Sequence, residues 1–162
     1  MMKKKINIGL IGCGVVGFKR IKNLPNTFNL IGCADPIIFS KNINVNKKIL
    51  LTKNWKKLIN LENLEAVIIS TTHHLHSKIL LECIKKNIHV FVEKPAGVSL
   101  KVTKNILLKL NLKRNLKVRV GFNHRYHPAF LKAKQLVKNN KIGKIIYIRA
   151  VYGHGGRLNY EK

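Results

Sequence analysis

Two short motifs in the sequence combine residue types that carry chemistry, and each follows an apolar run. The glycine motif Gly12-Cys13-Gly14-Val15-Val16-Gly17 comes directly after the run 6–11. The second motif, Glu93-Lys94-Pro95, comes directly after the run 88–92, in which four of the five residues are apolar. The first pattern is typical of a phosphate-binding turn, and the second indicates a lysine that could act as an acid or base.

Each glycine of the first motif has its own physical task. Gly12 permits a tight turn, Gly14 lets the backbone approach a pyrophosphate, and Gly17 lets the following helix pack closely on the strand. The positive end of that helix, which begins with Val15 and Val16, would hold the pyrophosphate. A glycine-rich turn without a ligand is the alternative, but a strand before the motif and a helix after it favour a dinucleotide site.

Asp35 lies about 20 positions beyond the glycine motif, at the end of a second apolar run. A carboxylate there would accept hydrogen bonds from the adenosine ribose hydroxyls and would repel a 2′-phosphate, which favours NAD over NADP. NADP remains an alternative, because nearby lysines such as Lys41 could hold the extra phosphate. Asp35 also precedes Pro36, so an ordinary turn aspartate is the competing interpretation.

The polar segment 70–76 follows another apolar run. It contains three histidines, at His73, His74 and His76. Three histidines in four positions suggest zinc, but no Asp, Glu or Cys partner follows at the spacing of a zinc site, so we expect no metal. We expect instead a loop that lines a cofactor and substrate crevice, with Thr71 and Thr72 at its start.

Lys94 could be an ordinary surface lysine, but its neighbours argue for a functional role. The apolar run before it and Pro95 after it make the backbone rigid, and Glu93 could orient the side chain. Beside oxidised nicotinamide, and partly desolvated, a lysine would give up its own proton more readily. Such a lysine is suited to take a proton from a hydroxyl group.

These motifs need secondary-structure elements that bring them to one edge of a sheet. The apolar runs predict strands over 6–11, 29–34, 66–70, 88–92 and 116–121. The stretches between them predict helices over 15–23, 55–61 and 77–86, and one after Ser99 as N-cap. This alternation predicts an α/β fold, a Rossmann-type doubly wound parallel sheet, in which ligands bind beyond the carboxyl ends of the strands.

The last 40 residues follow a different pattern. Residues 128–139 predict an amphipathic helix, with Gly143 as a stop signal, and residues 144–152 predict a strand. A strand with nothing after it to pair with resembles the start of a second domain. We therefore divide the chain into 1–122, an NAD(P)-binding Rossmann domain, and 123–162, the first helix and strand of an incomplete α/β domain.

The formal net charge is +26, because 32 Lys and Arg face only six acidic residues among 162. Such a balance would suit nucleic-acid or anionic-membrane binding. The lysines are spread along the chain, however, and the abundance of Lys, Asn and Ile fits A/T-rich codons. We therefore favour a lysine-rich surface, with no specific nucleic-acid partner.

The cysteine pattern and the apolar runs argue against three further classes: disulfide-stabilised, zinc-binding and membrane proteins. Cys13, Cys33 and Cys83 are odd in number and form no Cys-x-x-Cys motif, which indicates neither a disulfide framework nor a zinc site. A reducing cytoplasm fits that pattern. Because the apolar runs fall short of the ~20 residues of a membrane span, we expect no membrane association.

Together these motifs resemble the Gfo/Idh/MocA oxidoreductase family, which includes glucose–fructose oxidoreductase and inositol dehydrogenase. The matching segments are 12–17, Asp35, 71–76, 93–95, 121–128, 142–145 and 151–155. The resemblance covers essentially the whole chain, and Glu-Lys-Pro after a strand is its most specific element. One departure is Thr71-Thr72, where family members often have Thr-Pro.

The resemblance implies an NAD(P)-dependent dehydrogenase that moves hydride between nicotinamide and a sugar, cyclitol or nucleotide-sugar carbinol. Lys94 would be the acid/base, and His76 would line the nicotinamide region. Family members carry a second domain with most substrate contacts and the oligomer interface, so a full-length form is expected to be a homo-oligomer. Only the start of that domain is present here, so by this resemblance the chain is a truncated form: either the gene is truncated, or the rest is encoded elsewhere, or this sequence is partial. A nucleotide-binding fragment without catalysis is the second hypothesis, and a basic nucleic-acid-binding protein is the third.

Overall fold

The computed structural model describes residues 4–37, 49–151 and 153. The chain divides into two compact units, 1–122 and 123–162. Within the described residues of the first unit, six strands form one parallel sheet in the order β3-β2-β1-β4-β5-β6. The strands are β1 (Ile6–Ile11), β2 (Phe28–Ala34), β3 (Leu50–Thr52), β4 (Ala66–Ile69), β5 (His89–Val92) and β6 (Val118–Val120). The predicted Rossmann-type sheet is confirmed, and its strand order reverses between β1 and β4.

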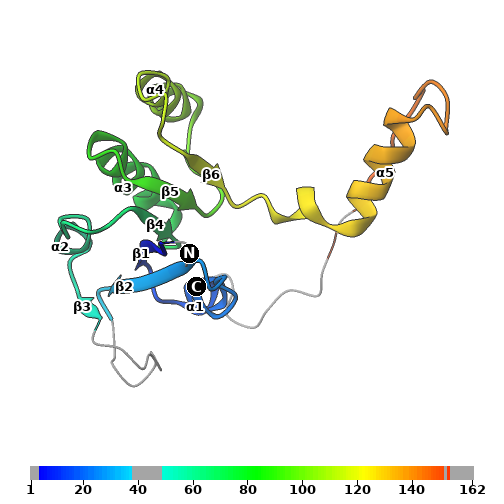
Figure 1. Cartoon of the computed structure of the whole chain (residues 1–162). Helices are drawn as coiled ribbons and strands as arrows, with labels where there is room; N and C mark the ends of the chain where they lie inside the picture. The colour runs from blue at the N-terminus through cyan, green and yellow to red at the C-terminus, as the bar shows by residue number, and fades with distance from the viewer. Residues whose placement is uncertain (1–3, 38–48, 152, 154–162) are drawn as a thin grey trace. The chain divides into compact units, whose positions relative to one another are not determined.

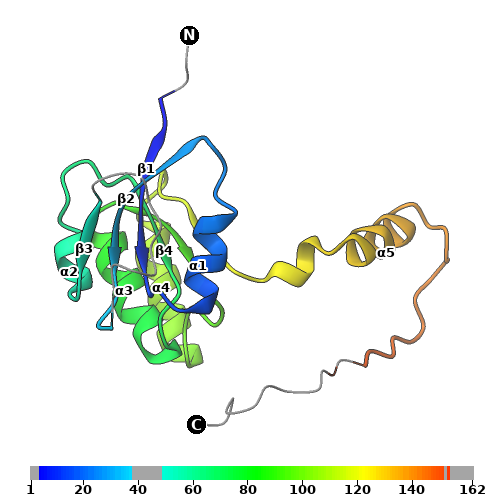
Figure 2. The same ribbon diagram turned by 90° about the horizontal axis from the view of Figure 1, so that it is seen from below.

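Helices cover both faces of this sheet. They are α1 (Val15–Lys22), α2 (Trp55–Leu58), α3 (His73–Lys85) and α4 (Leu100–Asn111). Helix α1 lies on one face, and α2, α3 and α4 lie on the other (Figures 1 and 2). Ser99 caps α4 by accepting a hydrogen bond from the Val102 N–H at 3.3 Å, as the sequence predicts. In the described part of the chain, no helix is long and apolar enough to span a membrane.

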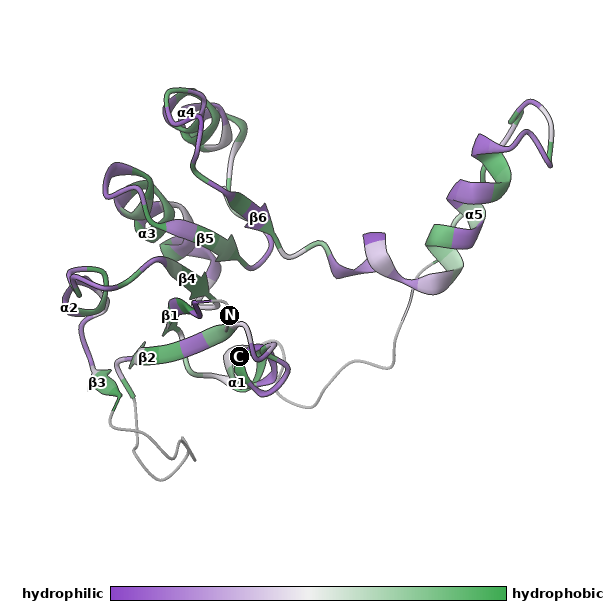
Figure 3. Cartoon of the chain, viewed as in Figure 1, coloured by the Kyte–Doolittle hydropathy of each residue, from purple (hydrophilic) through white to green (hydrophobic). Residues whose placement is uncertain are grey.

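The core has two parts because successive residues of a strand point to opposite faces. On the α1 face, Leu10 and Ile68 are buried with Phe18 of the helix packed against them. On the other face, Ile11 and Leu80 belong to a larger cluster shared with α2, α3 and α4. In the hydropathy colouring, β4 and β6 are largely hydrophobic, whereas α3 and α4 alternate between hydrophobic and hydrophilic residues (Figure 3).

Two boundaries in the first unit differ from the sequence prediction. Helix α3 begins at His73 and not at Ser77, because Thr72 adopts an extended conformation and serves as the N-cap. The expected loop 70–76 is therefore shorter than predicted. Strand β3 was not predicted, because its three residues carry little pattern of their own. It exists through pairing with residues 32–34 of β2.

The second unit contains the predicted helix. A 3-10 turn, η2 (Asn123–Tyr126), precedes α5 (Pro128–Lys138). The His127 side chain caps α5 by accepting a hydrogen bond from the Ala129 N–H at 3.3 Å, and Pro128 occupies the first turn. Asn140, with φ of 52°, follows the end of the helix.

The strand predicted over 144–152 is wrong for the part that the structure describes, 144–151, where the chain forms no strand. Ile146 is 94% exposed and Ile148 is 72% exposed. A β-strand needs a neighbour to satisfy its backbone N–H and C=O groups, and the alternating pattern alone does not supply one. Tyr152 and residues 154–155 of the expected continuation lie outside the described residues, as does Lys41.

Candidate functional site

The carboxyl ends of four adjacent strands meet at one edge of the sheet. Ile11 of β1 stands opposite Ala34 of β2 and Ile69 of β4, and Ile69 stands opposite Val92 of β5. Backbone hydrogen bonds continue this pairing one residue further, because the N–H groups that follow β1, β4 and β5 each donate to a neighbouring strand at 2.8–2.9 Å. The glycine motif, Asp35, the segment after β4 and Glu93-Lys94-Pro95 are thereby brought together.

The room for a Cβ atom differs among the three glycines of the motif, as the tasks expected of them from the sequence require. Gly12 has φ of +94°, and a Cβ atom on it would lie 2.6 Å from the Ser70 carbonyl group. A Cβ on Gly17 would lie 2.1 Å from the carbonyl oxygen of Gly12 and 2.8 Å from Ser70 Oγ. Around Gly14, by contrast, no heavy atom of the described residues comes within 4 Å of that position. Two glycines therefore permit close packing, and the third leaves room for a ligand.

The open side of Gly14 is also the amino end of α1. Gly14 is the N-cap and brings no side chain to the free N–H groups of the first turn. The first turn, Val15-Val16-Gly17-Phe18, has no acidic side chain, and Val15 and Val16 are 76% and 46% exposed. The free N–H groups and the helix dipole both favour an anion here, so the cradle fits the pyrophosphate of a dinucleotide.

Asp35 follows β2 directly and faces the glycine loop. Its Oδ2 accepts a hydrogen bond from the Cys13 N–H at 2.7 Å, and its Oδ1 accepts one from the Ile37 N–H at 2.8 Å. The carboxylate is thus held in place by the backbone on both sides. A fixed, half-buried carboxylate beside the phosphate cradle fits the task of accepting hydrogen bonds from a ribose.

Ser70 connects the glycine loop to the end of β4, and the sequence analysis did not identify it. Its hydroxyl donates to the Gly12 carbonyl oxygen at 2.7 Å. Thr71 and Thr72 follow, with the Thr71 hydroxyl donating to the Thr72 carbonyl oxygen at 3.3 Å. A serine after the strand was the only signal in the sequence, and serine is too common at strand ends to be decisive.

His76 is buried, with 1% of its surface exposed. Its Nδ1 lies 2.9 Å from the Pro95 carbonyl oxygen, and its Nε2 lies 2.9 Å from the Thr71 carbonyl oxygen. The ring therefore joins the loop after β4 to the loop after β5. With both nitrogens facing carbonyl oxygens, His76 is removed from any metal site shared with the exposed His73 and His74. Its contact with nicotinamide stays a prediction.

Glu93 is bound by a residue that the sequence analysis did not identify, Arg20 of α1. Arg20 Nε donates to Glu93 Oε1 at 2.7 Å, and Nη2 donates to the same oxygen. The guanidinium also lies over the Phe91 ring, 5.1 Å from its centroid. A Cβ on Gly121 would lie 2.9 Å from Glu93 Oε2, so the backbone just after β6 packs closely against the same carboxylate. The expected orienting role toward Lys94 is untested, and the contact found here is an ion pair to α1.

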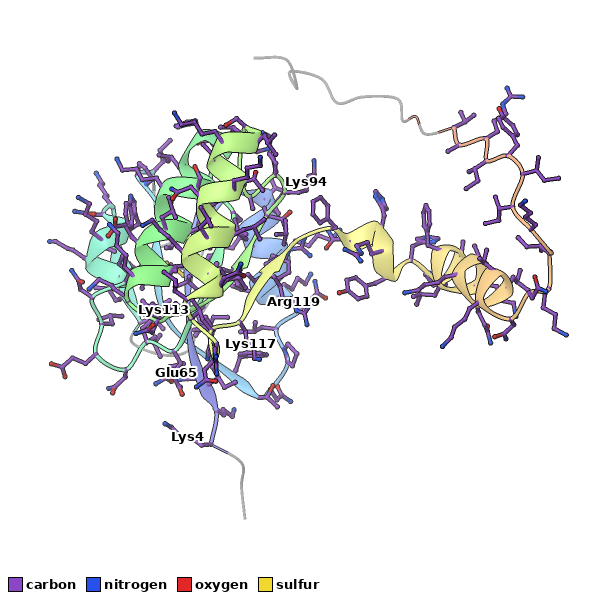
Figure 4. All side chains as sticks on the ribbon, turned by 90° about the horizontal axis from the view of Figure 1, so that it is seen from above. Lys4, Glu65, Lys94, Lys113, Lys117 and Arg119 are labelled. Atoms are coloured by element: carbon purple, nitrogen blue, oxygen red, sulfur yellow. The ribbon has the colours of Figure 1, made fainter. Side chains whose placement is uncertain are left out.

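Lys94 is the second residue after β5 and has an exposed side chain. Figure 4 shows it at the opposite edge of the first unit from Lys4, Glu65 and Lys113. The lysine therefore stands at the edge where the strands end, beside the fixed backbone of Glu93 and Pro95. This position is open to a substrate hydroxyl and suits proton transfer.

Comparison with known proteins identifies the family and the fold. The sequence model of a family described as an oxidoreductase family with an NAD-binding Rossmann fold matches residues 6–122. A myo-inositol 2-dehydrogenase of Thermotoga maritima is 29% identical over 143 residues, which are 86% of this chain and 42% of the relative. The predictions of this family, of the fold and of NAD as the cofactor are thus confirmed at the level of the family.

Solved structures give the same result. A myo-inositol 2-dehydrogenase from Lactobacillus plantarum superimposes with a TM-score of 0.78 and 26% identity, covering 89% of this chain and 44% of that one. A scyllo-inositol dehydrogenase from Lactobacillus casei with bound NAD(H) and scyllo-inositol shares the fold, with a TM-score of 0.77 and 24% identity over 86% of this chain and 43% of that one. The chain spans less than half the length of these relatives.

Alanine at Gly14 should affect cofactor binding, whereas alanine at Gly17 should affect the stability of the fold. Gly14→Ala should leave the free energy of unfolding within about 0.5 kcal/mol, because the new methyl meets open space, but should weaken NADH binding. Gly17→Ala should destabilise the fold by about 1–3 kcal/mol, because backbone atoms must move. Urea unfolding and NADH fluorescence titration measure the two quantities. Unchanged NADH affinity in Gly14→Ala would show that the cradle is not the phosphate site.

Replacing Arg20 should test the ion pair to Glu93. Arg20→Met keeps the aliphatic contact with Phe91 but leaves the Glu93 carboxylate, whose side chain is only 13% exposed, without this partner. We expect a loss of about 1–3 kcal/mol in the free energy of unfolding. The matched control is Lys19→Met on the exposed side of the same helix, which should change stability little. Equal effects of the two substitutions would mean that the pair contributes nothing.

Proposed function

We propose that this chain, which belongs to the Gfo/Idh/MocA oxidoreductase family, is the nucleotide-binding half of an NAD-dependent dehydrogenase acting on a cyclitol or sugar. The observation that carries the proposal is the meeting of three features at one edge of the sheet. The open glycine cradle lies beside the fixed Asp35 carboxylate, and Lys94 stands at the end of β5 on the same edge. The proposed cofactor cradle and ribose contact thus follow the adjacent strands β1 and β2, and the proposed acid/base follows β5, which is separated from β1 by β4.

In this proposal the glycine loop and the first turn of α1 hold the pyrophosphate of NAD. Asp35 accepts hydrogen bonds from the adenosine ribose, and Thr71, Thr72 and His76 lie toward the nicotinamide end. NAD supplies an acceptor for the hydride that leaves a carbinol carbon. Glu93 contributes indirectly, because its ion pair with Arg20 fixes α1 against the strand that carries Lys94.

Lys94 takes the proton of the substrate hydroxyl as the carbinol is oxidised, and returns it in the reverse direction. A carbinol is the shared chemical feature of cyclitols, sugars and nucleotide sugars. Inositols are the favoured class, because the named relatives are inositol dehydrogenases. A sugar or nucleotide sugar is the alternative substrate.

The second unit, residues 123–162, belongs in this proposal to the domain that contacts substrate. Helix α5 and the apolar segment 145–151 offer exposed hydrophobic side chains, among them Phe130, Ile146 and Tyr147. Burial of such side chains requires further structure. We place the remaining substrate contacts and a homo-oligomer interface on that structure, and the whole enzyme in the cytoplasm.

Two other functions stay in competition. A nucleotide-binding module without catalysis would bind NADH but never oxidise a polyol, even when the rest of a dehydrogenase is supplied. A nucleic-acid-binding function would draw on the net charge of +26. A salt titration of DNA binding separates it, since charge alone gives a steep salt dependence and no sequence preference.

We expect NADH to bind more tightly than NADPH, because the Asp35 carboxylate would repel a 2′-phosphate. Titration should be done at high salt, which screens the general attraction of a basic protein for the extra phosphate. Asp35→Asn keeps the size and an acceptor oxygen but loses the charge, so it should reduce the preference. Tighter NADPH binding by the wild type at high salt would refute the assignment of Asp35.

Lys94→Ala should affect turnover and not cofactor binding. In a form that includes the substrate domain, we expect turnover to fall by about 10²–10⁴-fold with the NADH dissociation constant nearly unchanged. Lys101→Ala, in an exposed position of α4, is the matched control for loss of one positive charge. If Lys94→Ala instead abolishes NADH binding and leaves turnover per bound cofactor unchanged, the lysine is a cofactor ligand.

A further inference from the structure

Two of the three cysteines lie together beside the glycine loop. Cys33 is in β2, opposite Leu10 of β1, and is fully buried. Cys13 is in the glycine loop, half-buried, and packs against the same cluster on the α1 face of the sheet. Its Sγ lies 3.9 Å from the carbonyl oxygen of Ala34, the residue after Cys33. A buried and a partly accessible thiol therefore meet where the cofactor cradle joins β2.

Each thiol shifts the pKa of the other. A hydrogen bond between them lowers the pKa of Cys33, against the opposing effect of its burial. The same hydrogen bond, together with burial and the negative charges of Cys33 and Asp35, raises the pKa of Cys13. Cys33 therefore loses its proton more readily than Cys13, and a thiolate is the form that attacks an oxidised sulfur.

We propose that Cys13 and Cys33 form a reversible disulfide that weakens dinucleotide binding by displacing the glycine loop. The effect on binding rests on the proposed function, whereas formation of the bond does not. The co-reactant is a peroxide. The fold thus contains an oxidation-sensitive site next to the cofactor cradle.

The reaction with hydrogen peroxide balances in two steps. Cys13, the more accessible of the two, gives up its thiol proton as its sulfur attacks the peroxide and becomes a sulfenic acid; the O–O bond breaks, and the departing hydroxide takes up that proton and leaves as one water molecule. The Cys33 thiolate then attacks the Cys13 sulfur, the S–O bond breaks, and the departing hydroxide is protonated to a second water. One peroxide is reduced and two thiols are oxidised. A dithiol reductant reverses the reaction by thiol–disulfide exchange.

The glycine loop has little room to follow the new bond. A disulfide holds its two sulfur atoms about 2.05 Å apart, which is closer than two unbonded sulfur atoms can approach. Forming the bond therefore draws Cys13 toward β2. Gly12 and Gly17 already lie in closest contact with Ser70 and with each other. The Cys13 N–H is meanwhile bonded to Asp35 Oδ2 at 2.7 Å. A shift of Cys13 must therefore disturb both the phosphate cradle and the ribose contact.

Cys83 offers an internal control. It belongs to α3 and to the core on the opposite face of the sheet, and burial raises its pKa to about 12. It should stay reduced under conditions that oxidise the other two. A disulfide that includes Cys83 would require unfolding.

The experiment treats the whole chain with hydrogen peroxide, isolates the monomer, blocks remaining thiols and maps tryptic peptides without reduction. We expect peptide 6–19 linked to peptide 23–41, with peptide 79–85 blocked as a free thiol. NADH affinity should fall about tenfold or more, and dithiothreitol should restore it. Cys83→Ser should behave as the wild type. Cys13→Ser should form no such link and should keep its NADH affinity after peroxide.

Cys33→Ala is the second variant and should give the same protection if it folds. Absence of the 6–19 to 23–41 link in the folded monomer overturns the proposed disulfide. A complete link with unchanged NADH affinity overturns its effect on binding. If the reduced chain binds no NADH, the proposed function fails, while the peptide map still decides whether the bond forms.

Discussion

The close approach of α1 to the end of β4 is the constraint on which the rest of this site depends. The backbone at Gly12 and Gly17 comes so near to Ser70 and to itself that a single methyl group would not fit. Because the helix begins this close to the strand ends, its amino terminus points into the crevice and not over the side of the sheet. The free N–H groups of the first turn are then available where the strand order reverses.

The close packing of α1 on the strand ends also determines which residues the later part of the helix contacts. Two turns after Gly14, Arg20 lies against Phe91 and donates to Glu93, so the cofactor helix is bonded to the strand that carries Lys94. On the other face, His76 joins the loops after β4 and β5 through the Thr71 and Pro95 carbonyl oxygens. The segment 93–95 is thus held from both sides of the sheet, which fixes the backbone of an otherwise exposed lysine.

The glycine loop is constrained from β2 as well. Asp35 accepts a hydrogen bond from the Cys13 N–H, and the Cys13 Sγ lies 3.9 Å from the carbonyl oxygen of Ala34. A residue that occupies a variable position of the glycine motif therefore has two contacts with the neighbouring strand. The Asp35 carboxylate and the Cys13 thiol are thus connected through the same short stretch of backbone, so a displacement of one should affect the other.

Local sequence pattern was enough to predict the strands and helices with strong patterns, the tight glycine turn, and the positions of Asp35 and Lys94 just beyond strand ends. Apolar runs, glycine spacing and a lysine between a carboxylate and a proline are local signals, and local sterics and burial decide them. It failed at β3 and at residues 144–151, because a strand depends on a partner that local pattern does not reveal. The hydrogen-bond and ion-pair partners of Glu93, His76, Ser70 and Cys13 became apparent only in the tertiary structure. Among these contacts, that between Arg20 and Glu93 spans the largest distance along the chain, 73 residues. The two side chains meet only because α1 lies across the sheet from β1 to β5. Such contacts depend on the position of one folded element against another, which spacing along the chain does not encode.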